Sequence, residues 1–155
     1  MRINAYDDIH NVSSITPQSI TGSSAVNGVS VDTLGYDNAK IHVYADEASG
    51  SPSAASLAVT LQESTDGTGS GAGAWTTAND NTGTPIGFTL SGLNAAAGVN
   101  AARVEGLNLN RKRYLRIVVT PSFTGGTSPA ILAYGEIIFG GNPQQLPVTT
   151  GVSDT

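Results

Sequence analysis

Cysteine is absent from this chain of 155 residues, and charge is scarce. Without cysteine there can be no disulfide framework, zinc-thiolate site or thiol nucleophile. Only 12% of the residues are Asp, Glu, Lys or Arg, whereas about 25% is usual in a soluble domain. The formal net charge is -5, so we expect no general attraction to nucleic acid. The length indicates one domain, large enough to form a hydrophobic core without disulfides or metals.

Long apolar runs and helical periodicity are also missing. No run approaches the roughly 18 residues needed to span a membrane. The first residues lack the basic and apolar regions of a secretory signal. The chain has 19 Gly and 7 Pro, and no segment repeats apolar residues at helical spacing over three turns. We therefore expect no membrane partner, and at most one helical turn, at 94–98.

Alternating apolar residues predict β-strands instead. The clearest are 40–45, 57–63 and 114–120, and others are expected at 29–33, 74–78, 86–90, 101–109 and 130–139. In the three clearest strands the alternation directs these side chains to the core: Ile41, Val43, Ala45, Leu57, Val59, Leu61, Leu115, Ile117 and Val119. Turns rich in Gly, Ser, Asn and Asp join the strands, and four glycines between 67 and 73 mark a loop tip. This pattern predicts an all-β single domain, a β-sandwich or jelly roll, with a closed barrel as the alternative.

The two ends of the chain are polar and carry few core candidates. We expect an N-terminal arm at 1–27 with a possible first strand near 18–21, a β-sandwich at 28–141 and a C-terminal tail at 142–155. Extended arms that become ordered only against a partner indicate assembly. The last strand is apolar on both faces near its end, at Ile138 and Phe139, which is typical of a subunit interface or of a sandwich centre.

Catalytic groups are few and poorly placed. His10 and His42 are the only histidines, and no Gly-x-Ser-x-Gly elbow is present. Glu63 and Asp66 flank the Gly-rich loop, whereas a catalytic acid needs a rigid setting. A calcium site would need convergent oxygen ligands, and the candidates are Asp66, Asp80 and Asn81. We expect no enzyme activity, no cofactor, no metal and no small-molecule substrate.

Basic residues are concentrated in one part of the chain. Five of the seven lie within 14 positions, namely Arg103, Arg111, Lys112, Arg113 and Arg116. A hairpin of 101–109 with 114–120 would place Arg103 and Arg116 on neighbouring strands. The group is then either a solvated hairpin or a docking surface for an acidic protein, because Arg pairs with carboxylates through two hydrogen bonds.

Three motifs in order resemble a known family. They are VDTLGY at 31–36, ESTDG at 63–67 followed by Trp75, and RYLRIVV at 113–119. In combination they resemble small virion structural proteins of tailed bacteriophages, in particular head decoration, or cement, proteins. The resemblance implies a β-sandwich, commonly a homotrimer, made in the bacterial host cytoplasm. It also implies a place on the capsid exterior, where the protein bridges neighbouring major capsid subunits.

The expected contact regions combine the arms, the basic group and the last strand. The residues are Arg103, Arg111, Lys112, Arg113, Arg116, Ile138, Phe139, Pro143, Leu146 and Pro147. The alternative is a carbohydrate-binding or receptor-adhesion module of a phage spike, fibre or tail. In that interpretation Trp75, Tyr36 and Tyr44 would stack on sugar rings.

Overall fold

A computed structural model describes residues 9–36, 38–67, 75–94, 101–108 and 111–140, without the side chains of 101–106 and 108. Every regular element in these residues is a β-strand. The strands are β1 (Ile9–Thr21), β2 (Val26–Asn27), β3 (Val31–Asp32), β4 (Asn38–Ala45), β5 (Ala54–Ser64), β6 (Thr76–Thr77), β7 (Gly87–Ser91), β8 (Ala101–Asn108), β9 (Tyr114–Thr124) and β10 (Ala130–Gly140). The all-β prediction is therefore confirmed.

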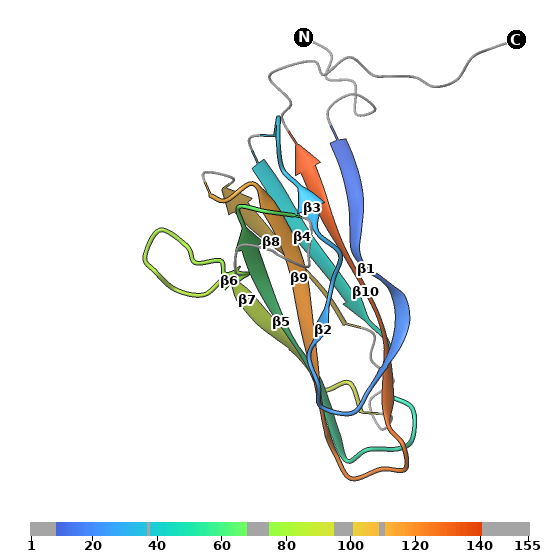
Figure 1. Ribbon diagram of the computed structural model, residues 1–155. Coiled ribbons are helices and arrows are strands. Elements are labelled where there is room, and N and C mark those ends of the chain that lie inside the picture. Colours follow the sequence, from blue (N-terminus) through green and yellow to red (C-terminus); the bar gives the residue numbers. More distant parts are fainter. Residues whose placement is uncertain (1–8, 37, 68–74, 95–100, 109–110, 141–155) are drawn as a thin grey trace, which may run out of the picture.

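The strands form two facing sheets (Figure 1). Sheet A has four strands in the order β1-β10-β4-β8. Sheet B has six, with β2-β9-β5-β6 as its main path, β3 beside β9 and β7 beside β5. All the named pairs are antiparallel. This arrangement is a β-sandwich, whose core lies between the two inner faces.

The predicted core residues of the three clearest strands are confirmed. All nine are at most 2% exposed, and they are Ile41, Val43, Ala45, Leu57, Val59, Leu61, Leu115, Ile117 and Val119. β4 supplies this core from sheet A, and β5 and β9 supply it from sheet B. The alternation works because successive side chains of a strand point to opposite faces of its sheet.

Residues 9–21 of the expected N-terminal arm form a long strand. β1 extends over Ile9–Thr21 and pairs with β10, from Ile9 opposite Gly140 to Thr21 opposite Ala130. Ile15 and Ile20 are buried in the core, at 0% and 2% exposure. The expected first strand thus exists, but it begins well before residue 18. The register shifts between Ser13 and Gln18 break the alternation, which is why this strand gave a weak pattern in the sequence.

The predicted hairpin of 101–109 with 114–120 is wrong. β8 pairs with β4 in sheet A, whereas β9 pairs with β5 in sheet B. Arg103 and Arg116 therefore lie in different sheets. The two strands are close in sequence, but Leu107 and Leu115 contribute to the core from opposite sides, so the chain crosses between the sheets. The predictions for the loop at 68–73, the turn at 95–98 and the tail at 142–155 lie outside the described residues.

β1 is attached to the opposite sheet through a buried serine. The Ser14 hydroxyl accepts a hydrogen bond from the Ile117 N–H at 3.0 Å and donates one to the Val29 carbonyl at 2.9 Å. The Gly28 N–H donates to the Ile117 carbonyl at 2.8 Å, and the Val29 N–H donates to the Ser14 carbonyl at 2.7 Å. A Cβ on Gly28 would lie 2.4 Å from the Ser14 hydroxyl oxygen, so glycine is required where residues 28–29 contact Ser14 of β1 and Ile117 of β9.

Candidate functional site

The described ends of the chain meet at one end of the sandwich. Ile9 pairs with Gly140, and Gly140 also pairs with Asn38 at the start of β4. In Figure 1 the start of β1 and the end of β10 lie side by side at the top, next to the turn that follows β3. We call this region the terminal end, and define it as Ile9, His10, residues 32–36, residues 111–114 and Gly140.

Stacked rings fill the terminal end. The Tyr36 ring lies 4.5 Å from the Phe139 ring and 6.1 Å from the His10 ring, measured between centroids. Phe139 is 1% exposed and belongs to the core. The preceding residue of β10, Ile138, lies on the outer face of sheet A and is half-buried. Ile138 and Phe139 are the two residues of the last strand that were expected to contact a partner. Phe139 packs in the core, and Ile138 faces outward.

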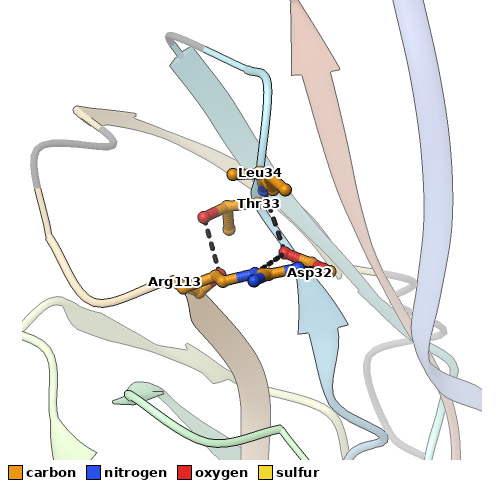
Figure 2. A network of polar contacts seen from close by, with 4 residues as sticks. All are labelled: Asp32, Thr33, Leu34 and Arg113. Carbon is orange, nitrogen blue, oxygen red and sulfur yellow. Dashed lines mark hydrogen bonds and ion pairs between the residues drawn. The ribbon is translucent and has the colours of Figure 1, made fainter. Parts of the chain in front are cut away.

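Asp32 and Arg113 form a two-pronged ion pair at the terminal end (Figure 2). Arg113 Nε donates to Asp32 Oδ1 at 2.9 Å, and Arg113 Nη2 donates to Asp32 Oδ2 at 2.7 Å. The Leu34 N–H also donates to Asp32 Oδ1, and the Thr33 hydroxyl donates to the Arg113 carbonyl. The hydrogen bonds from Arg113 lower the pKa of Asp32, and those to Asp32 raise the pKa of Arg113. The pair joins the turn after β3 to the start of β9.

The other basic residues of β9 and its preceding turn also have partners within the chain. Arg111 lies 3.8 Å from the Glu63 carboxylate, and Lys112 donates to the Thr76 hydroxyl at 2.7 Å. Arg116 donates two hydrogen bonds to Gln62 Oε1, and its guanidinium lies 4.4 Å from the centre of the Trp75 ring. Carboxylates thus accompany both Arg111 and Arg113, which reduces the positive potential expected for this region. The backbone of Arg103 is described in β8, opposite Val43.

Two exposed apolar side chains mark the terminal end, and sequence reasoning missed both. Ile9 is 54% exposed and Leu34 is 61% exposed. Val29 and Leu132 are exposed to a similar extent, but Val29 is hydrogen-bonded beside Ser14, and Leu132 lies opposite Ser19 on sheet A. Single exposed apolar residues carry no periodic signal, so only the tertiary structure could reveal them.

The outer face of sheet A carries a polar cluster on its two central strands. His42 Nδ1 lies 3.0 Å from Glu136 Oε1, and the Tyr134 hydroxyl donates to Glu136 Oε2 at 2.7 Å. Burial alone would raise the pKa of Glu136, but the hydrogen bonds from His42 and Tyr134 outweigh it, and the pKa is lowered. Hydrogen bonding to Glu136 also raises the pKa of Tyr134. The prediction that His42 faces outward is confirmed.

The three aromatic residues considered for sugar binding do not form one platform. Tyr36 is stacked on Phe139 at the terminal end. Tyr44 pairs with Tyr134 on the outer face of sheet A, whereas Trp75 lies beside β6 in sheet B and carries the Arg116 guanidinium on its ring. A sugar ring stacks on an open aromatic face, and these residues lie on different parts of the sandwich.

One of the carboxylates considered for calcium, that of Asp80, shapes a turn. Asp80 Oδ1 accepts hydrogen bonds from the Thr82 hydroxyl and from the backbone N–H groups of Thr84 and Thr82, which lowers the pKa of Asp80. Glu63, considered for catalysis, lies at the end of β5 near Arg111. Among the described residues, no three His, Asp or Glu side chains are grouped so that they could hold a metal ion. Nor does this part of the chain contain a helix long and apolar enough to cross a membrane.

Sequence comparisons do not place the chain in a family. No protein-family model matches it, and no curated protein matches its sequence. The likenesses that exist are structural and lie among solved proteins.

Three solved structures share the fold. The PBSX exported protein XepA is 18% identical with a TM-score of 0.50, and the match covers 85% of this chain and 37% of that one. Infectious bursal disease virus, Gx strain, is 14% identical with a TM-score of 0.51, covering 90% and 33%. The T13 particle of the same virus is 10% identical with a TM-score of 0.50, covering 88% and 31%. The match spans about a third of the length of each of these three chains.

At these identities the comparisons establish the fold alone. The chain belongs to the class of all-β, jelly-roll-like sandwiches, a fold that it shares with the PBSX exported protein XepA and with chains of infectious bursal disease virus. Of the two architectures considered from the sequence, the sandwich is confirmed and the closed barrel is not observed, because the strands divide into two separate sheets.

Proposed function

We propose that this chain is a structural protein of a bacteriophage virion, which binds the capsid exterior and cements neighbouring major capsid subunits. The proposal is supported by the jelly-roll-like fold, by the motif resemblance at 31–36, 63–75 and 113–119, and by the terminal end. The role is non-catalytic, and the partners are the major capsid protein and other copies of the chain, expected as a homotrimer.

The observation that carries the proposal is the meeting of several strand ends at the terminal end. Ile9, where β1 begins, pairs with Gly140, where β10 ends. The exposed Leu34 lies in the turn after β3 at the same end. Segments that are distant in sequence thus present one composite surface, on which a neighbouring subunit could dock.

The exposed apolar residues suggest which surface meets the capsid. Ile9 and Leu34 lie at the terminal end, where Leu34 is hydrogen-bonded to Asp32 of the Asp32–Arg113 pair and Ile9 pairs with Gly140. Apolar side chains at the centre of a polar region are typical of protein interfaces. Arg111, Lys112 and Arg113 surround this region but are engaged with Glu63, Thr76 and Asp32. We infer that these basic residues hold the shape of the surface and that the apolar residues supply most of the binding energy.

Repetition over a lattice would compensate for weak individual contacts. Within the described residues each copy exposes only four large apolar side chains, so one contact made by them alone would be of low affinity. When many copies bind a shell, and each copy binds two subunits, the second contact of each copy becomes intramolecular and the total stabilisation is large. A low-charge surface suits this role, because few charged groups lose their hydration on binding.

Cryo-electron microscopy of purified virions tests the proposal directly. We expect density for the sandwich between capsomers, with the terminal end toward the shell. Virions that lack the chain, or that carry it in a tail fibre, would contradict the proposal.

Binding to stripped particles tests the surface. We expect Leu34→Asp to lower the occupancy of the chain on such particles about tenfold, as for a central interface residue. Val29→Asp is the matched control, because Val29 is 57% exposed and Leu34 is 61% exposed, but Val29 lies away from the terminal end. Equal losses for both variants would argue against the terminal end as the contact surface.

A further inference from the structure

The open edges of the two sheets differ in how they are protected from pairing with another strand. Along the main path of sheet B the outermost strands are β2 and β6, and these have two residues each, as does β3. Strands of two residues offer almost no ladder to an incoming strand. The other outer strand of sheet B, β7, has five residues and contacts β8 of sheet A. Sheet A instead ends on two long strands, β1 with 13 residues and β8 with 8.

β8 has a second kind of protection. Its Arg103 pairs with Val43 and its Glu105 pairs with Ile41, and both of these partners are fully buried on the core side of sheet A. An edge strand of sheet A thus carries two charged residues. Charged residues on an edge strand are a common device against pairing with a further strand.

The first part of β1 has none of these protections. Ile9–Thr21 contains no Asp, Glu, Lys or Arg. Pro17 and the register shifts between Ser13 and Gln18 disrupt the middle of the strand, and the Val29 N–H covers the Ser14 carbonyl. Residues 9–13 precede all of these features and, among the described strands, pair with β10 alone. Ile9, Asn11 and His10 are exposed in this stretch.

We propose that residues 9–13 of β1 pair antiparallel with the same residues of a second copy of this chain, around a twofold axis at Asn11. A strand edge presents alternating N–H and C=O groups, so the occupant must be another extended strand. A twofold axis places two identical edges antiparallel, which makes the contact self-complementary. Because the stretch holds no formal charge, no like charges meet.

The register of this pairing follows from the symmetry. Asn11 lies opposite Asn11 of the second copy, and Ile9 lies opposite Ser13, so the exposed Ile9 side chain gains a neighbour. Sheet A of each copy then continues into the other. Ile9 belongs both to this pairing and to the proposed capsid contact, whereas Asn11 lies outside the terminal end, so varying Asn11 tests the pairing separately. The pairing can join two single copies or two larger oligomers.

Opposite charges at Asn11 test the pairing by sedimentation velocity over a range of concentrations. The wild-type chain should associate reversibly. Asn11→Lys and Asn11→Glu should each weaken that association about tenfold or more, because two like charges then face each other across the axis. An equimolar mixture of the two variants should restore it, which only pairing between copies at this residue would produce.

Ser19→Lys and Ser19→Glu are the matched controls. Ser19 is also exposed on β1, but it lies beyond Pro17 and opposite Leu132. These variants should associate as the wild type does. The proposal is overturned if the wild-type chain stays unassociated up to about 1 mM, the range of the weakest specific contacts, if the Asn11 variants associate unchanged, or if their mixture fails to recover. Unchanged urea unfolding midpoints would show that the variants are folded, and retained capsid binding would separate this result from the proposed function.

Discussion

Replacing Ser14 with alanine should destabilise the protein strongly, although the change removes only one hydroxyl group. The Ser14 hydroxyl is 2% exposed and bridges the Ile117 N–H of sheet B and the Val29 carbonyl. Alanine leaves both of these groups without that partner. A buried polar group that loses its partner costs about 1–3 kcal/mol. With two groups affected and some relaxation allowed, we expect a loss of about 2–4 kcal/mol in the free energy of unfolding.

Gly28→Ala tests the same contact between Ser14, Gly28 and Ile117 by adding a methyl group at Gly28. Its Cβ would lie 2.4 Å from the Ser14 hydroxyl oxygen and 2.7 Å from the carbonyl oxygens of Ile117 and Ser14. Because two of these contacts are with backbone atoms, the chain around Gly28 has to move away from Ser14 and Ile117. We therefore expect the free energy of unfolding to fall by at least about 2 kcal/mol. The double variant should lose less than the sum of the two single losses, since the variants disrupt the same contacts.

Urea unfolding measures these losses. The midpoint should fall while the slope stays constant, which identifies a change in stability rather than in the denatured state. Ser19→Ala is the control, because Ser19 is an exposed residue of the same strand and should change stability by less than about 0.5 kcal/mol. If Ser14→Ala unfolds within that same margin of the wild type, the attachment of β1 through Ser14 is not what holds the two sheets together.

Three further predictions concern ionic and aromatic contacts. Asp32→Asn should cost at most about 1 kcal/mol, because the Asp32–Arg113 pair is nearly half exposed, and a double-mutant cycle with Arg113→Ala in low and high salt should show the coupling shrink with salt. The pKa of Glu136 is lowered in the folded protein, so its contribution to stability is present above pH 4.5 and is lost as the pH falls through the folded pKa. In Glu136→Gln the fall in stability below pH 4.5 should therefore be smaller than in the wild type. Thermal unfolding at pH 7 and at lower pH measures this difference. Trp75 is the single tryptophan, and Arg116→Ala should shift its fluorescence emission to longer wavelength by admitting water to the ring; an unchanged spectrum would contradict the stacking of Arg116 on Trp75.

The core could be predicted from the sequence because its signal is local. Alternation at 40–45, 57–63 and 114–120 depends only on neighbouring residues, and the structure buries the predicted face of each strand. The strand of Ile9–Thr21 was underestimated for the opposite reason. Its two register shifts move Ile15 and Ile20 out of a simple two-residue period, so the pattern is hidden although both residues are buried.

The basic group shows what proximity in sequence does not determine. Arg103 and Arg116 are 13 positions apart, yet they lie in different sheets because β8 and β9 choose different partners. Asp32 lies far from Arg113 in sequence but forms its ion pair. A residue's charge can be read from the sequence, whereas the group that balances the charge depends on strand pairing across the whole fold.

The amino-acid sequence by itself determined that this protein is all-β, which residues of its three clearest strands face the core, and that the chain is poor in charge. These properties follow from the side-chain period and from composition, which are local. Only the tertiary structure decided that Ile9, Leu34 and Gly140 share one end, that Ser14 joins the sheets, and that β1 forms an open edge. Each of these features depends on which distant strands pair, because the hydrogen bonds between strands join residues that are far apart in the sequence.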